Sequence, residues 1–260
     1  MTQAKTASTE SYIDLHDFSI EPIDTKVFCL LKVGRKAHME SLAQGKLFCH
    51  HLSYYKKSEF QSEAFFDQHE GLLAVLQADR VKLKFSSPTI GEIEKELDPG
   101  TQMVLSVDLH SPTFCLHAIH SGEWTHKEFP EEEVWLFKEY LQVPDEMEKF
   151  RNQDEAPYVC VLNDGNAFFD RVKVASEKEN LGITGDLVKY VDLVKCHGSV
   201  ANHRVGFVKQ SRYKNEREYR IIFRGQHLSD PFQIDLGDLR DISQLMPLQE
   251  FKEKWELGFK

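Results

Sequence analysis

Apolar and polar positions alternate along this chain in short stretches, most of them long enough for a strand but not for a helix. The apolar run at residues 26–33 (Lys-Val-Phe-Cys-Leu-Leu-Lys-Val) predicts a first buried strand. Turn residues separate the later apolar runs. Further strands are expected at residues 46–52, 73–77, 81–85, 103–109, 113–119, 158–162, 189–194, 205–210, 218–223 and 233–236.

Helical spacing of apolar residues is confined to a few segments between these strands. One is residues 35–44, which ends at Gly45, and another is residues 165–175, where Phe168, Phe169 and Val172 recur at helical spacing. Helices are also expected at residues 130–140, 145–152 and 248–257, and residues 59–71 end at a turn glycine, Gly71.

Strands and helices do not alternate regularly, which argues against a doubly wound sheet. The pattern predicts an α+β fold with mixed, mostly antiparallel sheets and peripheral helices. Residues 1–22 are polar and are expected to form a flexible arm, and residues 23–260 a single domain.

Composition limits the class of protein. The 260 residues are 41% hydrophobic, which suits a globular core, and their net charge of −10 argues against non-specific DNA binding. No segment approaches the roughly 20 apolar residues of a membrane span, and the first ten residues lack a signal-peptide core. These features predict a cytoplasmic protein without a membrane partner.

Cysteine and histidine give no recognisable metal-binding spacing. The five cysteines are scattered, mostly in apolar runs, and are interpreted as buried reduced thiols. His50 and His51 would point to opposite faces of a strand, so they are not expected to chelate together. Cys115 and His117 would share one face of a strand, but no further ligand follows at a diagnostic spacing. We therefore expect no metal site.

Aromatic and acidic side chains in the N-terminal third are candidates for binding. Tyr54 and Tyr55 follow the second predicted strand and could stack a nucleobase or nicotinamide ring, or simply pack at the sheet edge. Asp67 and Glu70 lie three residues apart, where two carboxyl groups could share a proton or bind a cation. A role in capping or tethering the adjacent loop is the simpler interpretation.

The most informative segment is residues 213–223, a charged turn that enters an apolar strand. If the strand pattern extends through the turn, Glu216, Glu218 and Arg220 share one face, and Arg217, Tyr219 and Ile221 share the other. A carboxylate beside arginines on a strand is either a structural ion pair or a catalytic group.

The surrounding residues 209–224 carry a local net charge of +4. This concentration predicts a phosphate site for a nucleotide or an RNA backbone, unless the side chains form solvated cross-strand ion pairs. The sequence has no P-loop, dinucleotide-binding, nucleophile-elbow or zincin motif.

Taken together, these motifs resemble a largely uncharacterised bacterial and phage-associated family. The resemblance covers roughly residues 26–242 and includes residues 38–48, Tyr54-Tyr55, the Asp67-Gln-His-Glu-Gly71 motif and the Tyr213–Arg220 segment, which has the form Y-x-x-E-x-E-Y-R. The layout is also similar to ADP-ribosyltransferase-like folds, including toxins of bacterial anti-phage toxin–antitoxin systems.

This resemblance implies a transferase that takes ADP-ribose from NAD to RNA or protein, and it implies an antitoxin partner. It assigns Glu218 or Glu216 as the catalytic carboxylate and Tyr54 or Tyr55 as the ring-stacking residue. Lys32 or Arg35 would bind the nucleotide together with Arg217 and Arg220. The last two would also flank Glu218 and keep it ionised. Cleavage of the nicotinamide bond passes through an oxocarbenium-like state, which such a carboxylate stabilises.

Two other classes remain compatible with the sequence. One is a non-enzymatic regulatory module whose basic strand binds a nucleic acid or a protein. The other is a magnesium-dependent nuclease that uses Asp67, Glu70 and a later carboxylate.

Overall fold

The computed structural model describes residues 12–21, 25–56, 67–89, 91–120, 156–226 and 228–254. Its largest element is an eight-stranded sheet in which all the paired strands are antiparallel. Six strands follow in the order β10 (Gly182–Leu187), β14 (Glu218–Arg224), β8 (Pro112–His120), β2 (Val27–Gly34), β9 (Tyr158–Leu162) and β16 (Ser243–Pro247). The other two, β3 (Lys46–His51) and β15 (Phe232–Asp235), pair with each other, and β3 also pairs with the start of β8.

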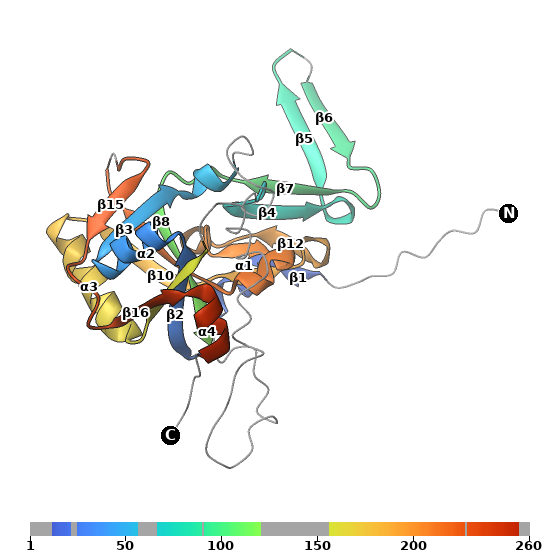
Figure 1. Cartoon of the computed structure of the whole chain (residues 1–260). Helices are drawn as coiled ribbons and strands as arrows, with labels where there is room; N and C mark the ends of the chain where they lie inside the picture. The colour runs from blue at the N-terminus through green and yellow to red at the C-terminus, as the bar shows by residue number, and fades with distance from the viewer. Residues whose placement is uncertain are drawn as a thin grey trace.

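A second sheet contains four strands, β1 (Ile13–Asp14), β12 (Cys196–Ser199), β4 (Leu72–Gln77) and β7 (Gln102–Ser106). A short parallel ladder joins β11 (Lys189–Val191) to β13 (Val208–Gln210). The antiparallel hairpin of β5 (Lys82–Ser87) and β6 (Gly91–Glu96) projects away from the body beyond β7 (Figure 1). The α+β class with mostly antiparallel sheets and few helices is therefore confirmed.

The helices are short and lie against the sheets. They are α1 (Leu15–Ile20), α2 (Lys36–Ala43), α3 (Gly165–Lys178) and α4 (Leu248–Lys254), with 3-10 helices η1 (Leu52–Lys56), η3 (Ala78–Arg80), η6 (Leu193–Lys195), η7 (Asn202–Arg204) and η8 (Ser211–Glu216). In the part of the chain described, no helix has the length and apolar character needed to cross a membrane.

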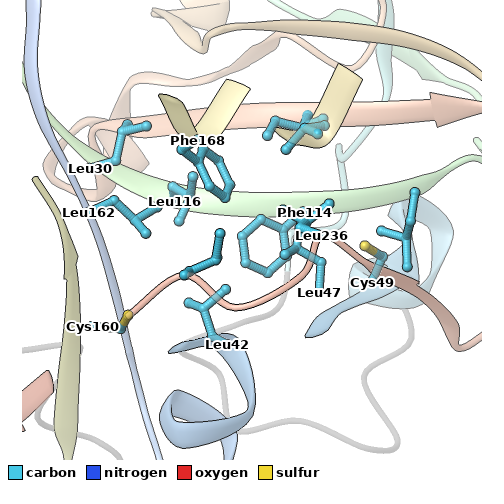
Figure 2. Packing of buried hydrophobic residues seen from close by; sticks show 14 of the residues in the cluster. Leu30, Leu42, Leu47, Cys49, Phe114, Leu116, Cys160, Leu162, Phe168 and Leu236 are labelled. Atoms are coloured by element: carbon cyan, nitrogen blue, oxygen red, sulfur yellow. The ribbon is translucent and has the colours of Figure 1, made fainter. Parts of the chain in front are cut away.

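The central strand β2 is buried on both faces of the large sheet. Leu30 packs into the cluster that α2 and α3 cover, whereas Leu31 and Val33 pack toward α4. Figure 2 shows the first of these clusters, where Leu30, Leu116 and Phe168 converge. The continuous apolar run that predicted a buried strand at residues 26–33 is explained by this packing on both sides.

Local signals account for the ends of the helices. Asp164 caps α3 by accepting a hydrogen bond from the Ala167 N–H at 2.9 Å. Gly45 follows α2 with a φ of +88°, and a Cβ there would approach the Gly237 carbonyl oxygen to 1.7 Å. Glycine is therefore needed at position 45 both for its conformation and for the close approach of residue 237.

Several sequence predictions need correction. The expected flexible arm is wrong for its second half, because Ile13–Ile20 forms β1 and α1, with Leu15 and Ser19 fully buried. The predicted strand at residues 189–194 ends at Val191, and η6 follows. The sequence did not predict β6, β10, β12 or β16; β10, for example, contains two glycines and exposed positions that weaken a strand signal. The helices expected at residues 130–140 and 145–152, and most of the segment 59–71, lie outside the described residues.

Candidate functional site

The Y-x-x-E-x-E-Y-R segment changes direction between its two glutamates. Glu216 ends η8, Arg217 has a left-handed φ of +43°, and β14 begins only at Glu218. The prediction that Glu216 lies on the same strand face as Glu218 and Arg220 is therefore wrong, because the left-handed residue breaks the alternation. Glu218 and Arg220 do share a face, as predicted, since they stand opposite His117 and Cys115 of β8.

Arg220 is the centre of the site. Its side chain is 1% exposed, and its two Nη atoms donate to Glu70 Oε1 and Oε2 at 2.7 and 2.9 Å. It also donates to the Gly206 carbonyl oxygen at 2.7 Å and to Glu218 Oε2 at 2.8 Å. A guanidinium held by two carboxylates in this way is fixed in orientation.

Lys209 of β13 brings a third carboxylate into the same group. Its Nζ lies 2.6 Å from Glu216, 3.6 Å from Glu218 and 3.9 Å from Glu70. We call Glu70, Lys209, Glu216, Glu218 and Arg220 the ion cluster. Its five side chains come from the turn before β4, from β13, from η8 and from β14.

Burial and neighbouring charges shift the two glutamates of the segment in opposite directions. Burial, opposed by Lys209 and reinforced by the Glu218 carboxylate, raises the pKa of Glu216 to about 7. Burial also acts to raise the pKa of Glu218, but Arg220 and Lys209 outweigh it, so that this pKa is lowered and the group is ionised. The second cation that keeps Glu218 ionised is thus Lys209, where the sequence suggested Arg217.

Neutral polar groups of β8 and β11 surround the cluster. The Cys115 thiol is hydrogen-bonded to Glu218, and the Glu218 N–H donates to the Tyr190 hydroxyl oxygen at 2.9 Å. His117 Nδ1–H donates to the Glu216 carbonyl oxygen at 2.8 Å, and burial lowers the pKa of this imidazole to about 4. Because the pKa of the Cys115 thiol is raised, by burial first and by Glu218 next, this cysteine is protonated and is a hydrogen-bond donor rather than a nucleophile.

The two candidate tyrosines, Tyr54 and Tyr55, have different surroundings in the structure. They lie on η1, not at the end of a strand, because β3 ends at His51. The Tyr54 ring stacks on His50 with 4.0 Å between centroids and touches Tyr55 edge-on at 5.6 Å. Of the two, Tyr55 is the one whose pKa responds to the cluster, since it is raised by burial first and then by Cys115 and Glu218.

The candidate nucleotide-binding residues Lys32 and Arg35 do not join the cluster. Lys32 donates to the Cys115 carbonyl oxygen and lies over the Phe114 ring, which belongs to the core on the opposite face of the sheet from Arg220. Arg35 is exposed at the start of α2. The alternation of β2 explains the first result, since Lys32 follows Leu31 and points the other way.

The basic residues of the segment 209–224 divide into a buried group and a group nearer the surface. Lys209 and Arg220 are buried and occupied by carboxylates, so they are not available to an anion at the surface. Arg217 remains partly exposed beside the cluster. Four cations of the segment lie outside the ion cluster, namely Arg212, Lys214, Arg217 and Arg224, and a phosphate site in this segment would use these residues.

Sequence reasoning found Asp67 and Glu70 but not the partner of Glu70. Asp67 tethers its own turn, as expected, by accepting from the His69 N–H at 2.9 Å. Glu70 instead pairs with a residue 150 positions later in the chain. The sequence showed Lys209 only as one member of a basic run. No pattern in it indicated the contacts of Gly206 and Tyr190 in the site.

His50 and His51 alternate along β3, as predicted: His50 is half-buried and contacts Phe48 and Tyr54, whereas His51 is buried and contacts His110. His50 and His51 both turn their Nδ1 atoms toward Asp230, at 2.9 and 3.9 Å. Across the described ranges, no group of three or more His, Cys, Asp or Glu side chains is arranged to hold a metal ion.

No protein-family model, curated protein or solved structure matches this chain.

Proposed function

We propose that this chain is an ADP-ribosyltransferase-like enzyme that cleaves the nicotinamide–ribose bond of NAD and transfers ADP-ribose to RNA or protein. Its biological role would be that of a toxin or phage-defence effector. The observation that carries the proposal is the opposite shift of two carboxylates two residues apart, one held ionised and one with a pKa of about 7. Such a split is how enzymes assign different roles to paired carboxyl groups.

The two glutamates have distinct roles in this chemistry. The ionised Glu218, fixed by Arg220 and Lys209, stabilises positive charge that develops on the ribose as the bond to nicotinamide breaks. Glu216, whose side chain is 22% exposed, accepts the proton of the attacking hydroxyl group. The bond from the acceptor oxygen to the ribose forms, nicotinamide leaves as a neutral molecule, and the proton resides on Glu216.

The tyrosines support binding of the ring rather than the chemistry. The Glu218 carboxylate is one of the groups that raise the pKa of Tyr55, and the Tyr54 ring touches the Tyr55 ring edge-on. One face of Tyr54 is already covered by His50. Tyr55 is therefore the better candidate to contact nicotinamide.

The test is release of nicotinamide from NAD, and transfer of label from NAD carrying ³²P in its adenylate phosphate, in the presence of bacterial RNA or protein. We expect Glu216→Gln to lower transfer at least about 100-fold, in line with loss of a general base. Glu40→Gln, which removes an exposed carboxylate of α2 that pairs with Lys36 at 3.7 Å, is the matched control and should retain full activity. Transfer to RNA or to protein identifies the acceptor.

Two results would contradict the proposal. One is wild-type protein that neither releases nicotinamide nor transfers label. The other is equal activity in wild type and Glu216→Gln. Salt-dependent RNA binding without any turnover would instead favour the regulatory module, and activity abolished by a chelator would favour the nuclease.

A further inference from the structure

Glu70 lies outside the Y-x-x-E-x-E-Y-R segment, and the proposed chemistry gives it no role. Its side chain is 2% exposed, yet both of its oxygens accept hydrogen bonds from Arg220. Burying a carboxylate costs free energy unless its partners compensate. A residue kept in this environment is a candidate for organising the groups around it.

The contacts of Arg220 decide which cation is left for Glu216. One Nη atom of Arg220 donates to Glu70 and to the Gly206 carbonyl, and the other donates to Glu70 and to Glu218. With Arg220 held in this way, the cation in contact with Glu216 is Lys209, at 2.6 Å. Lys209 is itself shared with Glu218.

The ion cluster has more acidic groups than basic groups. The ion cluster contains three carboxylates and two cations, so it carries one uncompensated negative charge when all five groups are ionised. The side-chain exposures of Glu70, Glu218 and Glu216 are 2%, 11% and 22%. Glu216 is the carboxylate of the three most open to solvent, and a proton can reach it.

Apart from Arg212 and Arg217, which lie toward the surface, the other titratable groups around the cluster bring no positive charge that would cancel this surplus. Burial raises the pKa values of Tyr55, Cys115 and Tyr190 and lowers that of His117, so these four groups are neutral near pH 7. Asp67, whose pKa is raised by burial and by Glu70, brings no positive charge. On η8, Arg212 is at the surface and donates to the Tyr213 hydroxyl at 2.6 Å.

We propose that Glu70 is a positioning residue for Glu216: by holding Arg220 it leaves the cluster one cation short, and Glu216 carries the compensating proton. Glu70 thus acts through Arg220 and Lys209 and does not touch the substrate. Under the proposed function, on which only this last step rests, Glu216 releases this proton before it accepts the proton of the attacking hydroxyl group.

The test follows the ionisation of Glu216 directly, by ¹³C NMR of protein labelled at the glutamate side-chain carboxyl carbons. Glu216→Gln identifies the signal. We expect Glu70→Gln to lower the titration midpoint of Glu216 by about one pH unit, a tenfold change in proton affinity. Glu70→Asp keeps the charge and should shift the midpoint less, whereas Glu40→Gln should leave it unchanged.

The pair Glu70→Gln and Glu70→Asp separates charge from packing. The glutamine variant preserves the size of the side chain, and the aspartate variant shortens it, so a purely structural role predicts the larger effect for aspartate. An unchanged midpoint in Glu70→Gln, or a shift in Glu70→Asp as large as that in Glu70→Gln, would overturn the proposal.

A second variant covers the case in which Glu70→Gln does not fold. Glu218→Gln also removes one carboxylate from the cluster and should lower the midpoint of Glu216, and an unchanged midpoint there counts against the proposal equally. Because no NAD is used, this outcome is independent of the transferase assay. A shifted midpoint together with no transfer of label would retain the role of Glu70 and reject the proposed function.

Discussion

A lysine lies between two carboxylates in two regions of the molecule, and the two regions differ in how far these charged groups are exposed to solvent. In the ion cluster, Lys209 lies between Glu216 and Glu218 with its side chain 9% exposed. In the β5–β6 hairpin, Lys82 lies 3.5 Å from Glu94 and 3.2 Å from Glu96 with its side chain 61% exposed. Both regions contain one lysine and two glutamates, but water solvates the lysine of the hairpin far more than that of the cluster.

The two regions differ because burial removes the water that would otherwise solvate and screen the charges. On the hairpin, water solvates each partner and screens the attraction, so the arrangement has little effect on stability. In the cluster each charge depends on its neighbours, because none can return to water without unfolding. In the buried region the pKa of Glu216 is raised and that of Glu218 is lowered.

The largest expected effect on stability is that of Arg220→Met. Loss of the guanidinium leaves Glu70 and Glu218 buried without their main partner, so we expect the free energy of unfolding to fall by about 3–5 kcal/mol. Urea denaturation followed by circular dichroism measures it.

The double variant Glu70→Gln/Arg220→Met is the control for this effect. Since it removes one of the stranded charges, it should be less destabilised than the sum of the single variants. A loss below about 1 kcal/mol in Arg220→Met, the range of a surface ion pair, would show that the two regions do not differ as argued.

A smaller effect is expected in the pH dependence of stability. The pKa of Glu216 is raised in the folded protein from 4.5 to about 7, so the folded state binds the proton more tightly than the unfolded state. The resulting stabilisation is fully present below pH 4.5 and is lost as the pH rises to about 7. Its full size is on the order of 3 kcal/mol.

The measurement is the difference in unfolding free energy between wild type and Glu216→Gln from pH 4 to pH 8. The difference is needed because His117, whose pKa is lowered to about 4, makes stability rise with pH over part of the same window. A difference curve without slope between pH 4.5 and pH 7 would contradict the assigned shift of Glu216.

The smallest effect is expected on the hairpin. Lys82→Ala removes the same kind of cation from between two glutamates, but in solvent, so the melting temperature should stay within experimental error of wild type at 0.15 M salt. A clear loss would mean that the hairpin charges act as a network, and it would bring the two regions closer together.

The sequence predicted best where structure depends on neighbours along the chain. The apolar run of β2, the helical spacing of Phe168 and Val172, and the glycine after α2 each appear where expected. The same logic failed at Glu216, because a single left-handed residue, Arg217, interrupts the strand alternation and leaves no pattern in composition. It also failed at residues 13–20, where four of the eight residues are apolar and Leu15 is fully buried. This stretch pairs with β12, and the Ser19 hydroxyl oxygen accepts from the Ala201 N–H at 3.1 Å.

From the sequence alone we could predict the α+β class, the position of most strands, and one segment, residues 213–223, in which carboxylates and arginines are close neighbours. This was possible because side-chain periodicity and turn chemistry are local properties of the chain. The pairing of Arg220 with Glu70, and the support of Glu218 by Lys209 instead of Arg217, became evident only in the folded chain. Ion pairing and pKa depend on distance and burial in space, and partners 150 residues apart along the chain meet only when the sheets are assembled.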